Sequence, residues 1–227
     1  MMMGACIKKT LSLILISLTL LSVLTITSCN RKYDEEEVLS NATKLLHRAE
    51  MLNEVYYGRG IQYISSAYQD GYYCEADPMH LSTLGFTTIR ELENLTLETF
   101  TVGYSEEIFS TKLSMIEDED GIREMTRYFQ RYDDEKMTEP VCIMVYTKAP
   151  VLKKGSIVYD YSTLRVTGVK KQTVYVSVTA IVSDDDGNSQ TTDIILNLIE
   201  EDNGWRIDNP CYANYSSVKD KYDELNK

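Results

Sequence analysis

The sequence has little positive charge, histidine, tryptophan or proline. Its 227 residues include 23 Lys and Arg against 35 Asp and Glu, which gives a formal net charge of −12. A chain this acidic is poorly suited to nucleic acid, because phosphate contacts need clustered basic side chains. Two histidines leave little material for a metal centre or a general base. Four prolines and eleven glycines exclude a collagen-like or linker-dominated chain.

Motifs for cofactors and metals are also missing. The sequence contains no glycine-rich phosphate loop and no pair of cysteines at zinc-binding spacing. Asp184, Asp186 and Asn188 alternate like the first ligands of a calcium loop, but Gly187 stands at the wrong position and no Glu occupies the twelfth. We therefore expect a hairpin turn there, with no metal and no cofactor.

Residues 1–28 have the layout of a secretory signal. Lys8 and Lys9 precede an uncharged stretch rich in Leu and Ile, which ends in Ile26-Thr27-Ser28-Cys29. This end resembles the lipobox of bacterial lipoproteins, where an aliphatic residue lies three positions before the cysteine and a small residue one position before it.

The lipobox resemblance implies a lipid on the Cys29 thiol and cleavage between Ser28 and Cys29. Two or three acyl chains anchor a protein firmly. The alternative is an uncleaved anchor, because the uncharged stretch is close to the roughly 20 residues that span a bilayer. Both interpretations tether the chain to the extracytoplasmic face of the cell membrane, or to the cell surface.

We expect residues 29–37 to be a polar tether and residues 38–227 to form one α+β domain. Its first part, 38–135, is predicted to be helical. Apolar residues recur there at helical spacing from Val38 to Tyr56, before Gly58. Thr88 and Glu91 form a capping box for another helix. Residues 122–132 are predicted to form a last short helix.

The second part, 141–208, is predicted to be an antiparallel meander of about five strands, followed by a polar tail, 212–227. From Val174 to Val182, valine and alanine alternate with more polar residues, as in a half-buried strand. Asn203-Gly204 is a strong hairpin signal. Helices followed by strands favour an α+β fold with the helices packed on one face of the sheet.

Two family resemblances follow from these elements. The phrase from Glu200 to Asp208, with Trp205 after the turn, is similar to the last hairpin of cystatin-like domains of the nuclear-transport-factor-two superfamily. The resemblance implies a curved sheet that forms a cone with its helices, with Trp205 at its mouth. It implies a module that binds a ligand or glycan, or less readily an enzyme.

The leucine-rich helix within Ser82 to Thr101, the segment from Tyr104 to Glu107 and the strands ending at Ile207 together resemble IseA-type proteins. These are exported inhibitors of D,L-endopeptidases of the cell wall. The implied function is restraint of peptidoglycan hydrolysis, and the implied partner is a cell-wall hydrolase or an envelope glycan.

Tyrosine supplies the candidate binding residues, with 17 in the chain. Tyr56-Tyr57 and Tyr72-Tyr73 flank glycine-containing segments, where we expect at least one member of each pair to be exposed. Tyrosine has an apolar ring and a polar tip, which suits recognition surfaces. These four residues could line a groove for a partner loop or a sugar chain.

We expect no enzyme and assign no catalytic residue. If the protein were an enzyme, Asp160 and Asp193 would be better candidates for a catalytic carboxylate than the acids in charged runs. They fall inside strands and could face a cone interior, where burial raises a carboxyl pKa. A Cys74–His80 dyad is disfavoured because catalytic pairs usually converge from distant segments. Cys74, Cys142 and Cys211 allow at most one disulfide, or buried thiols.

Overall fold

The longest helix, α2 (Glu35–Tyr57), begins earlier than expected and ends where expected. The structure is a computed structural model that describes residues 33–66, 69–114, 125–136, 138–152 and 155–212. Within it the predicted tether is already helical from Glu35, so the boundary at Val38 was three residues late. The end at Tyr57, directly before Gly58, is confirmed.

Short helices and strands follow α2, and their bounds are these: β1 (Gln69–Asp70), β2 (Tyr73–Glu75), α3 (Pro78–Leu84), α4 (Ile89–Thr99), α5 (Val102–Ile108), the π-helical turn η2 (Phe109–Leu113), β3 (Tyr128–Tyr132) and β4 (Pro140–Tyr146). The predicted capping box is confirmed at the start of α4. The Glu91 amide donates to the Thr88 hydroxyl, and the Thr88 amide donates to the Glu91 carboxylate.

The strands form two four-stranded antiparallel sheets, ordered β1-β2-β4-β3 and β5-β6-β7-β8. The second sheet contains β5 (Ser156–Lys170), β6 (Thr173–Ser183), β7 (Ser189–Glu201) and β8 (Gly204–Ile207). An α+β fold is therefore confirmed. The predicted hairpin forms with Asp202 and Asn203 in its turn, and Gly204 begins β8 opposite Glu201. The five-stranded meander is wrong, because β4 pairs with β2 and β3 instead of β5.

The predicted helix at residues 122–132 is also wrong where the structure describes it. Residues 128–132 form strand β3, and residues 122–124 lie outside the described residues. Pairing with β4 decides the outcome, because Tyr128 and Gln130 lie opposite Val145 and Ile143. The helical region 38–135 thus contains three strands, β1, β2 and β3.

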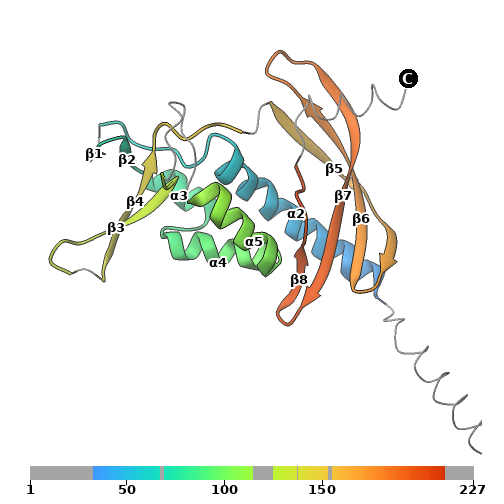
Figure 1. Cartoon of the computed structure of the whole chain (residues 1–227). Helices are drawn as coiled ribbons and strands as arrows, with labels where there is room; N and C mark the ends of the chain where they lie inside the picture. Colours follow the sequence, from blue (N-terminus) through green and yellow to red (C-terminus); the bar gives the residue numbers. More distant parts are fainter. Residues whose placement is uncertain (1–32, 67–68, 115–124, 137, 153–154, 213–227) are drawn as a thin grey trace, which may run out of the picture. The chain divides into compact units, whose positions relative to one another are not determined.

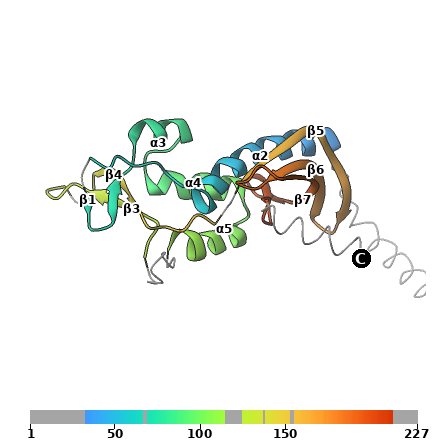
Figure 2. The ribbon, with the colours of Figure 1, turned by 90° about the horizontal axis from the view of Figure 1, so that it is seen from above.

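The larger core lies between α2 and the β5–β8 sheet. In Figures 1 and 2, α2 runs along one face of this sheet. The predicted alternation on β6 is confirmed, since Val174, Val176, Val178, Ala180 and Val182 are each at most 1% exposed. Ala42 and Ala49 of α2 also belong to the core, because neither has exposed surface. Residues 36–227 belong to one compact unit.

The carboxyl end of α2 is bound by two buried side chains at the start of β3. Arg127 donates from Nη2 to the Gly58 carbonyl (2.8 Å) and from Nη1 to the Pro150 carbonyl (3.1 Å). The Tyr128 hydroxyl donates to the Val55 carbonyl (2.7 Å) and accepts from the Ile61 amide (3.1 Å). A cation and a donor here satisfy helix carbonyls and complement the helix dipole.

Gly60 makes this close approach possible. Its φ of +78° is a left-handed conformation, and a Cβ there would collide with the Tyr128 hydroxyl. The turn after α2 is therefore fixed by a glycine on one side and by a tyrosine on the other.

Replacement of Arg127 tests the importance of this contact. We expect Arg127→Ala to lower the free energy of unfolding by about 2–4 kcal/mol, because buried carbonyls lose a charged donor. The matched control is Arg165→Ala, whose ion pair with Asp193 is half exposed; its cost should stay below about 1 kcal/mol. Urea unfolding measures both. Equal costs for the two variants would contradict the assignment.

Candidate functional site

The structure separates the two tyrosine pairs. Tyr56 and Tyr57 are 0% and 5% exposed, so the expectation that one of them is exposed was wrong. The Tyr56 hydroxyl bonds to the Thr96 hydroxyl of α4 at 2.8 Å, and the Tyr57 hydroxyl lies 3.5 Å from that of Tyr104 on α5. Burial raises the pKa of Tyr56. Both residues therefore belong to the core.

Tyr72 and Tyr73 lie on the small sheet, and here the prediction of exposure holds for Tyr72. Tyr72 is 53% exposed, with the Lys148 ammonium 4.1 Å from its ring centre. Tyr73 is half-buried, and its ring lies 4.9 Å from Phe129 and 5.0 Å from Tyr146. The cluster combines a rigid aromatic base with one accessible ring, which is an arrangement typical of recognition surfaces.

Other large apolar side chains are exposed in the segments next to the carboxyl end of β2. Tyr63 and Ile64 pair with Ala76 and Glu75 at its end, and Met79 follows in the first turn of α3. Met79 is 81% exposed in the first turn of α3, which Asp77 caps through the Met79 amide. We call Tyr63, Ile64, Tyr72 and Met79 the β2 surface.

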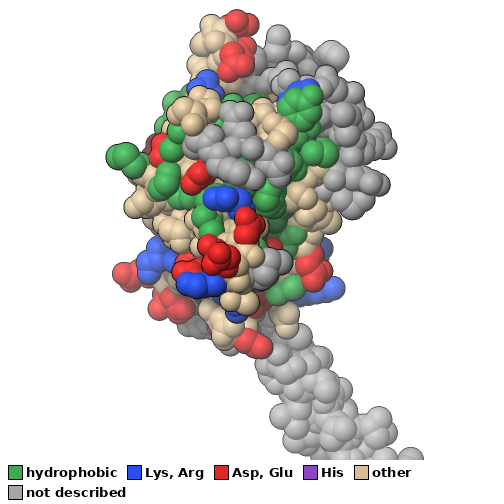
Figure 3. Space-filling view, turned by 90° about the vertical axis from the view of Figure 1, so that its left-hand side faces the viewer, with side chains coloured by type: hydrophobic (Ala, Val, Ile, Leu, Met, Phe, Trp, Pro, Cys, Tyr) green, Lys and Arg blue, Asp and Glu red, His purple; other side chains and the backbone are tan. Residues whose placement is uncertain are grey.

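Figure 3 views the molecule from the side on which the small sheet lies. Hydrophobic side chains spread over the upper part of this view, while acidic and basic side chains gather in its middle and lower part. The turn between β3 and β4 contributes exposed acids, Asp134, Glu135 and Glu139, with Lys136 paired to Glu139 at 3.2 Å. Tyr63, Ile64 and Met79 were not among the residues predicted from the sequence, where Asp77-Pro78 indicates only the start of a helix.

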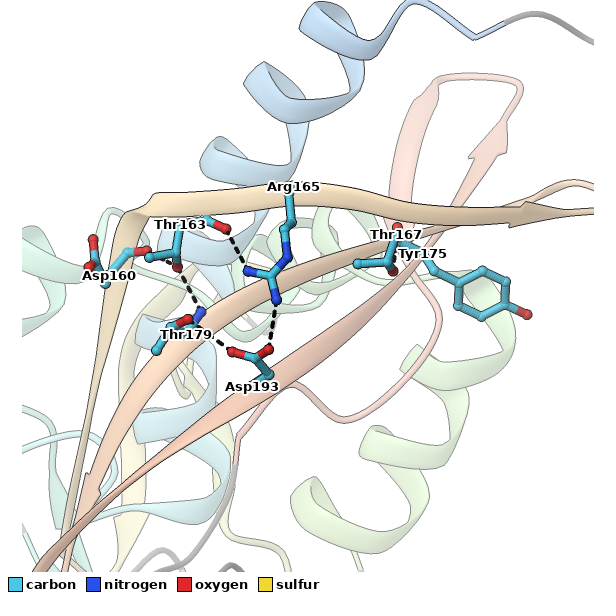
Figure 4. A network of polar contacts seen from close by, with 7 residues as sticks. All are labelled: Asp160, Thr163, Arg165, Thr167, Tyr175, Thr179 and Asp193. Atoms are coloured by element: carbon cyan, nitrogen blue, oxygen red, sulfur yellow. Dashed lines mark hydrogen bonds and ion pairs between the residues drawn. The ribbon is translucent and has the colours of Figure 1, made fainter.

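Asp160 and Asp193 do not face an interior. Both lie in one cross-strand row with Thr179, on the face opposite to the buried Val178 and Ala180. Figure 4 shows Arg165 and Asp193 pointing toward one another, 2.7 Å apart, with Asp160 apart from both.

The environment of Asp193 favours its charged form. The Thr179 hydroxyl, which donates to it at 2.9 Å, and Arg165 lower the pKa of its carboxyl. Asp160 accepts from the Ser162 amide at 3.0 Å. The enzyme alternative required these two residues to face an interior, and the structure places both on an exposed face instead. The face that they were expected to line is filled by β6, β7 and α2 side chains instead.

The three cysteines of the described chain are free and buried. Cys74 and Cys142 lie on β2 and β4, and Cys211 follows β8, so the disulfide left open by the sequence does not form. Burial raises the pKa of the Cys211 thiol to about 11, although the Asn53 amide donates to its sulfur at 3.4 Å. His80 accepts from the Gln62 amide through Nδ1 at 2.9 Å, so a backbone group occupies that nitrogen.

In the acidic turn between β6 and β7, the Asp184 carboxylate finds its hydrogen-bond donors within the turn itself. Asp184 accepts from the amides of Asp186 (3.1 Å) and Asn188 (2.8 Å) and from the Asn188 side chain (2.8 Å). The predicted hairpin turn is confirmed. Among the described residues, no group of three or more His, Cys, Asp or Glu side chains is placed to hold a metal ion.

The lipidation residue Cys29 and the cleavage residue Ser28 lie outside the described residues, as does the tail from residue 213. In the part of the chain that is described, no helix is both long and apolar enough to cross a membrane. Comparison with known proteins found no family model, no curated protein and no solved structure that matches the chain. The two family resemblances therefore stay predictions.

Thiol accessibility tests the assignment of the cysteines. In the chain from Asn30 onward, we expect Cys74, Cys142 and Cys211 to react with a thiol reagent only after unfolding, because all three thiols are buried and inaccessible to the reagent. Mass spectrometry after alkylation should find no label under native conditions and three labels in denaturant. A lower mass that indicates a disulfide, or rapid labelling under native conditions, would contradict the structure.

Proposed function

We propose that this protein is a lipid-anchored protein of the bacterial envelope that acts by binding, and that its partner is a peptidoglycan hydrolase whose action it restrains. The lipobox-like end of the leader supports the anchor at Cys29. The IseA-like order of elements supports the partner. The observation that carries the proposal is the β2 surface, where four large apolar side chains are exposed in the segments that flank β2.

The β2 surface has the properties of a protein contact. Scattered exposed apolar residues are ordinary, but a group of them beside polar side chains marks an interaction site. Tyrosine and methionine are enriched at such sites because they bury large areas. The ring of Tyr72 makes an edge contact with the ring of Tyr146, 6.4 Å between centres, which favours one orientation of Tyr72 before binding.

Charge supports the choice of partner. The chain carries a net charge of −12, and exposed acids lie in the turn next to the small sheet. An acidic surface attracts a basic enzyme and raises the rate of encounter more than it raises affinity. A wall-bound hydrolase with a basic surface is therefore the partner that this surface favours.

Binding is the preferred role over catalysis because of the state of the candidate acids. Asp193 is exposed, paired with Arg165 and held charged, so it lacks the raised pKa of a general acid at neutral pH. The space between α2 and the β5–β8 sheet holds packed side chains. These features favour a protein that presents surfaces.

One observation supports a second function, a glycan-binding module of the cystatin-like type. Tyr72 combines an exposed ring with a cation beside it, the Lys148 ammonium at 4.1 Å, and an exposed ring suits stacking against a sugar. The long helix α2 against an antiparallel sheet is also compatible with such a domain. The same surface would then bind the glycan strand instead of the enzyme.

A wall-clearing assay tests the proposal. The chain from Asn30 onward should slow the clearing of a peptidoglycan suspension by purified D,L-endopeptidases in a dose-dependent way. We expect Tyr72→Ser with Met79→Ser to raise the half-inhibitory concentration by about tenfold or more, because central apolar contacts each contribute over 1 kcal/mol.

The matched control replaces Val158 and Ile181 with serine. These residues are 61% and 48% exposed on the β5–β8 sheet, so the control removes exposed apolar surface away from the β2 surface. Its inhibition should equal that of the unchanged chain. No protection against any of several endopeptidases would refute the inhibitor. Binding to purified glycan strands that depends on Tyr72 would establish the second function instead.

A further inference from the structure

A groove lies between α4, the start of α5 and the turn from β7 to β8. Its volume is about 610 Å³, which is the size of a site for a small ligand. The polar side chains that line it are Asn94, Glu98, Glu201, Asp202, Asn203 and Arg206. None of its lining residues belongs to the β2 surface.

Arg206 is fixed at the wall of this groove. Its Nε donates to the Leu97 carbonyl at 2.7 Å and its Nη1 donates to the Trp205 carbonyl at 2.8 Å. Its Nη2 has no hydrogen-bond partner among the residues that the structure describes. An arginine whose plane is set by two carbonyls needs little further ordering to bind a carboxylate.

Three carboxylates line the same groove. Glu98 lies on α4, while Glu201 and Asp202 lie at the end of β7. Existing contacts hold them weakly: Glu98 is 3.5 Å from Arg48 in an exposed pair, and Glu201 accepts from the Val102 amide at 3.5 Å. With Arg206, three negative groups and one positive group leave a net charge of −2 in the groove.

We propose that this groove binds a short peptide that carries free ammonium groups and a terminal carboxylate. The ammonium groups bind Glu98, Glu201 and Asp202, and the carboxylate binds Nη2 of Arg206. Asn94 and Asn203 supply amides that can donate to and accept from the peptide backbone. The proposal uses no residue of the β2 surface and does not depend on the function proposed above.

Calorimetric titration with trilysine tests the ligand chemistry, using the chain from Asn30 onward. We expect saturable binding that weakens as salt is added, because exposed charges are screened. Trilysine amide, which lacks the terminal carboxylate, should bind about fivefold more weakly, the upper end for an exposed ion pair. Triglutamate should not bind. Equal binding of trilysine and its amide would overturn the role of Arg206.

Variants locate the site. Glu201→Gln keeps an oxygen for the Val102 amide and removes the charge, and with Asp202→Asn it should weaken trilysine binding by about tenfold or more. The matched control, Asp134→Asn with Glu135→Gln, removes the same charge from the β3–β4 turn and should leave the affinity unchanged. An equal loss in both double variants, or no saturable binding of trilysine, would overturn the proposal.

Discussion

The contact between Arg127, Tyr128 and the carboxyl end of α2 is the constraint on which the arrangement of the fold depends. The last carbonyls of a helix need partners, and those of a buried helix end cannot take them from water. Here the partners are Arg127, directly before β3, and Tyr128, its first residue; the strand neighbour of β3, β4, also pairs with β2. Arg127 also holds the Pro150 carbonyl, on the path from β4 to β5. One helix end thus fixes the small sheet and the connection to the large one.

The position of the β2 surface follows from that constraint. The chain leaves α2 at Gly58, turns at Gly60 against the Tyr128 hydroxyl, and brings Tyr63 and Ile64 beside β2. On the other side, Tyr146 of the central strand β4 supports Tyr72. The apolar side chains that we assign to partner binding are therefore presented by a buried scaffold, which lowers the entropy lost on binding. The α4 groove is fixed separately, by the bonds of Arg206 to Leu97 and Trp205.

Local signals in the sequence predicted local structure correctly. The interactions that form these structures involve neighbours within a few residues. Examples are the Thr88–Glu91 capping box, the alternation along β6 and the hairpin signalled by Asn203-Gly204. The errors lie where long-range pairing decides. Residues 128–132 form a strand because β4 lies beside them. Strand β4 pairs with β2 and β3, so it does not belong to the large sheet. Tyr56 and Tyr57 are buried because α4 and α5 pack over the end of α2, which no pattern around them reveals. The β2 surface could not be predicted from local patterns, because Tyr63 lies beside β2 only through its pairing with Ala76.

The central claim is that the β2 surface binds a wall hydrolase. Hydrogen exchange of backbone amides, measured with and without a D,L-endopeptidase, tests it most directly because it maps the contact along the whole chain. The account predicts slower exchange on binding for residues 61–64 and 71–80, with no change along β5, β6 and β7. Protection confined to the β5–β8 sheet, or no protection anywhere at saturating enzyme, would contradict it.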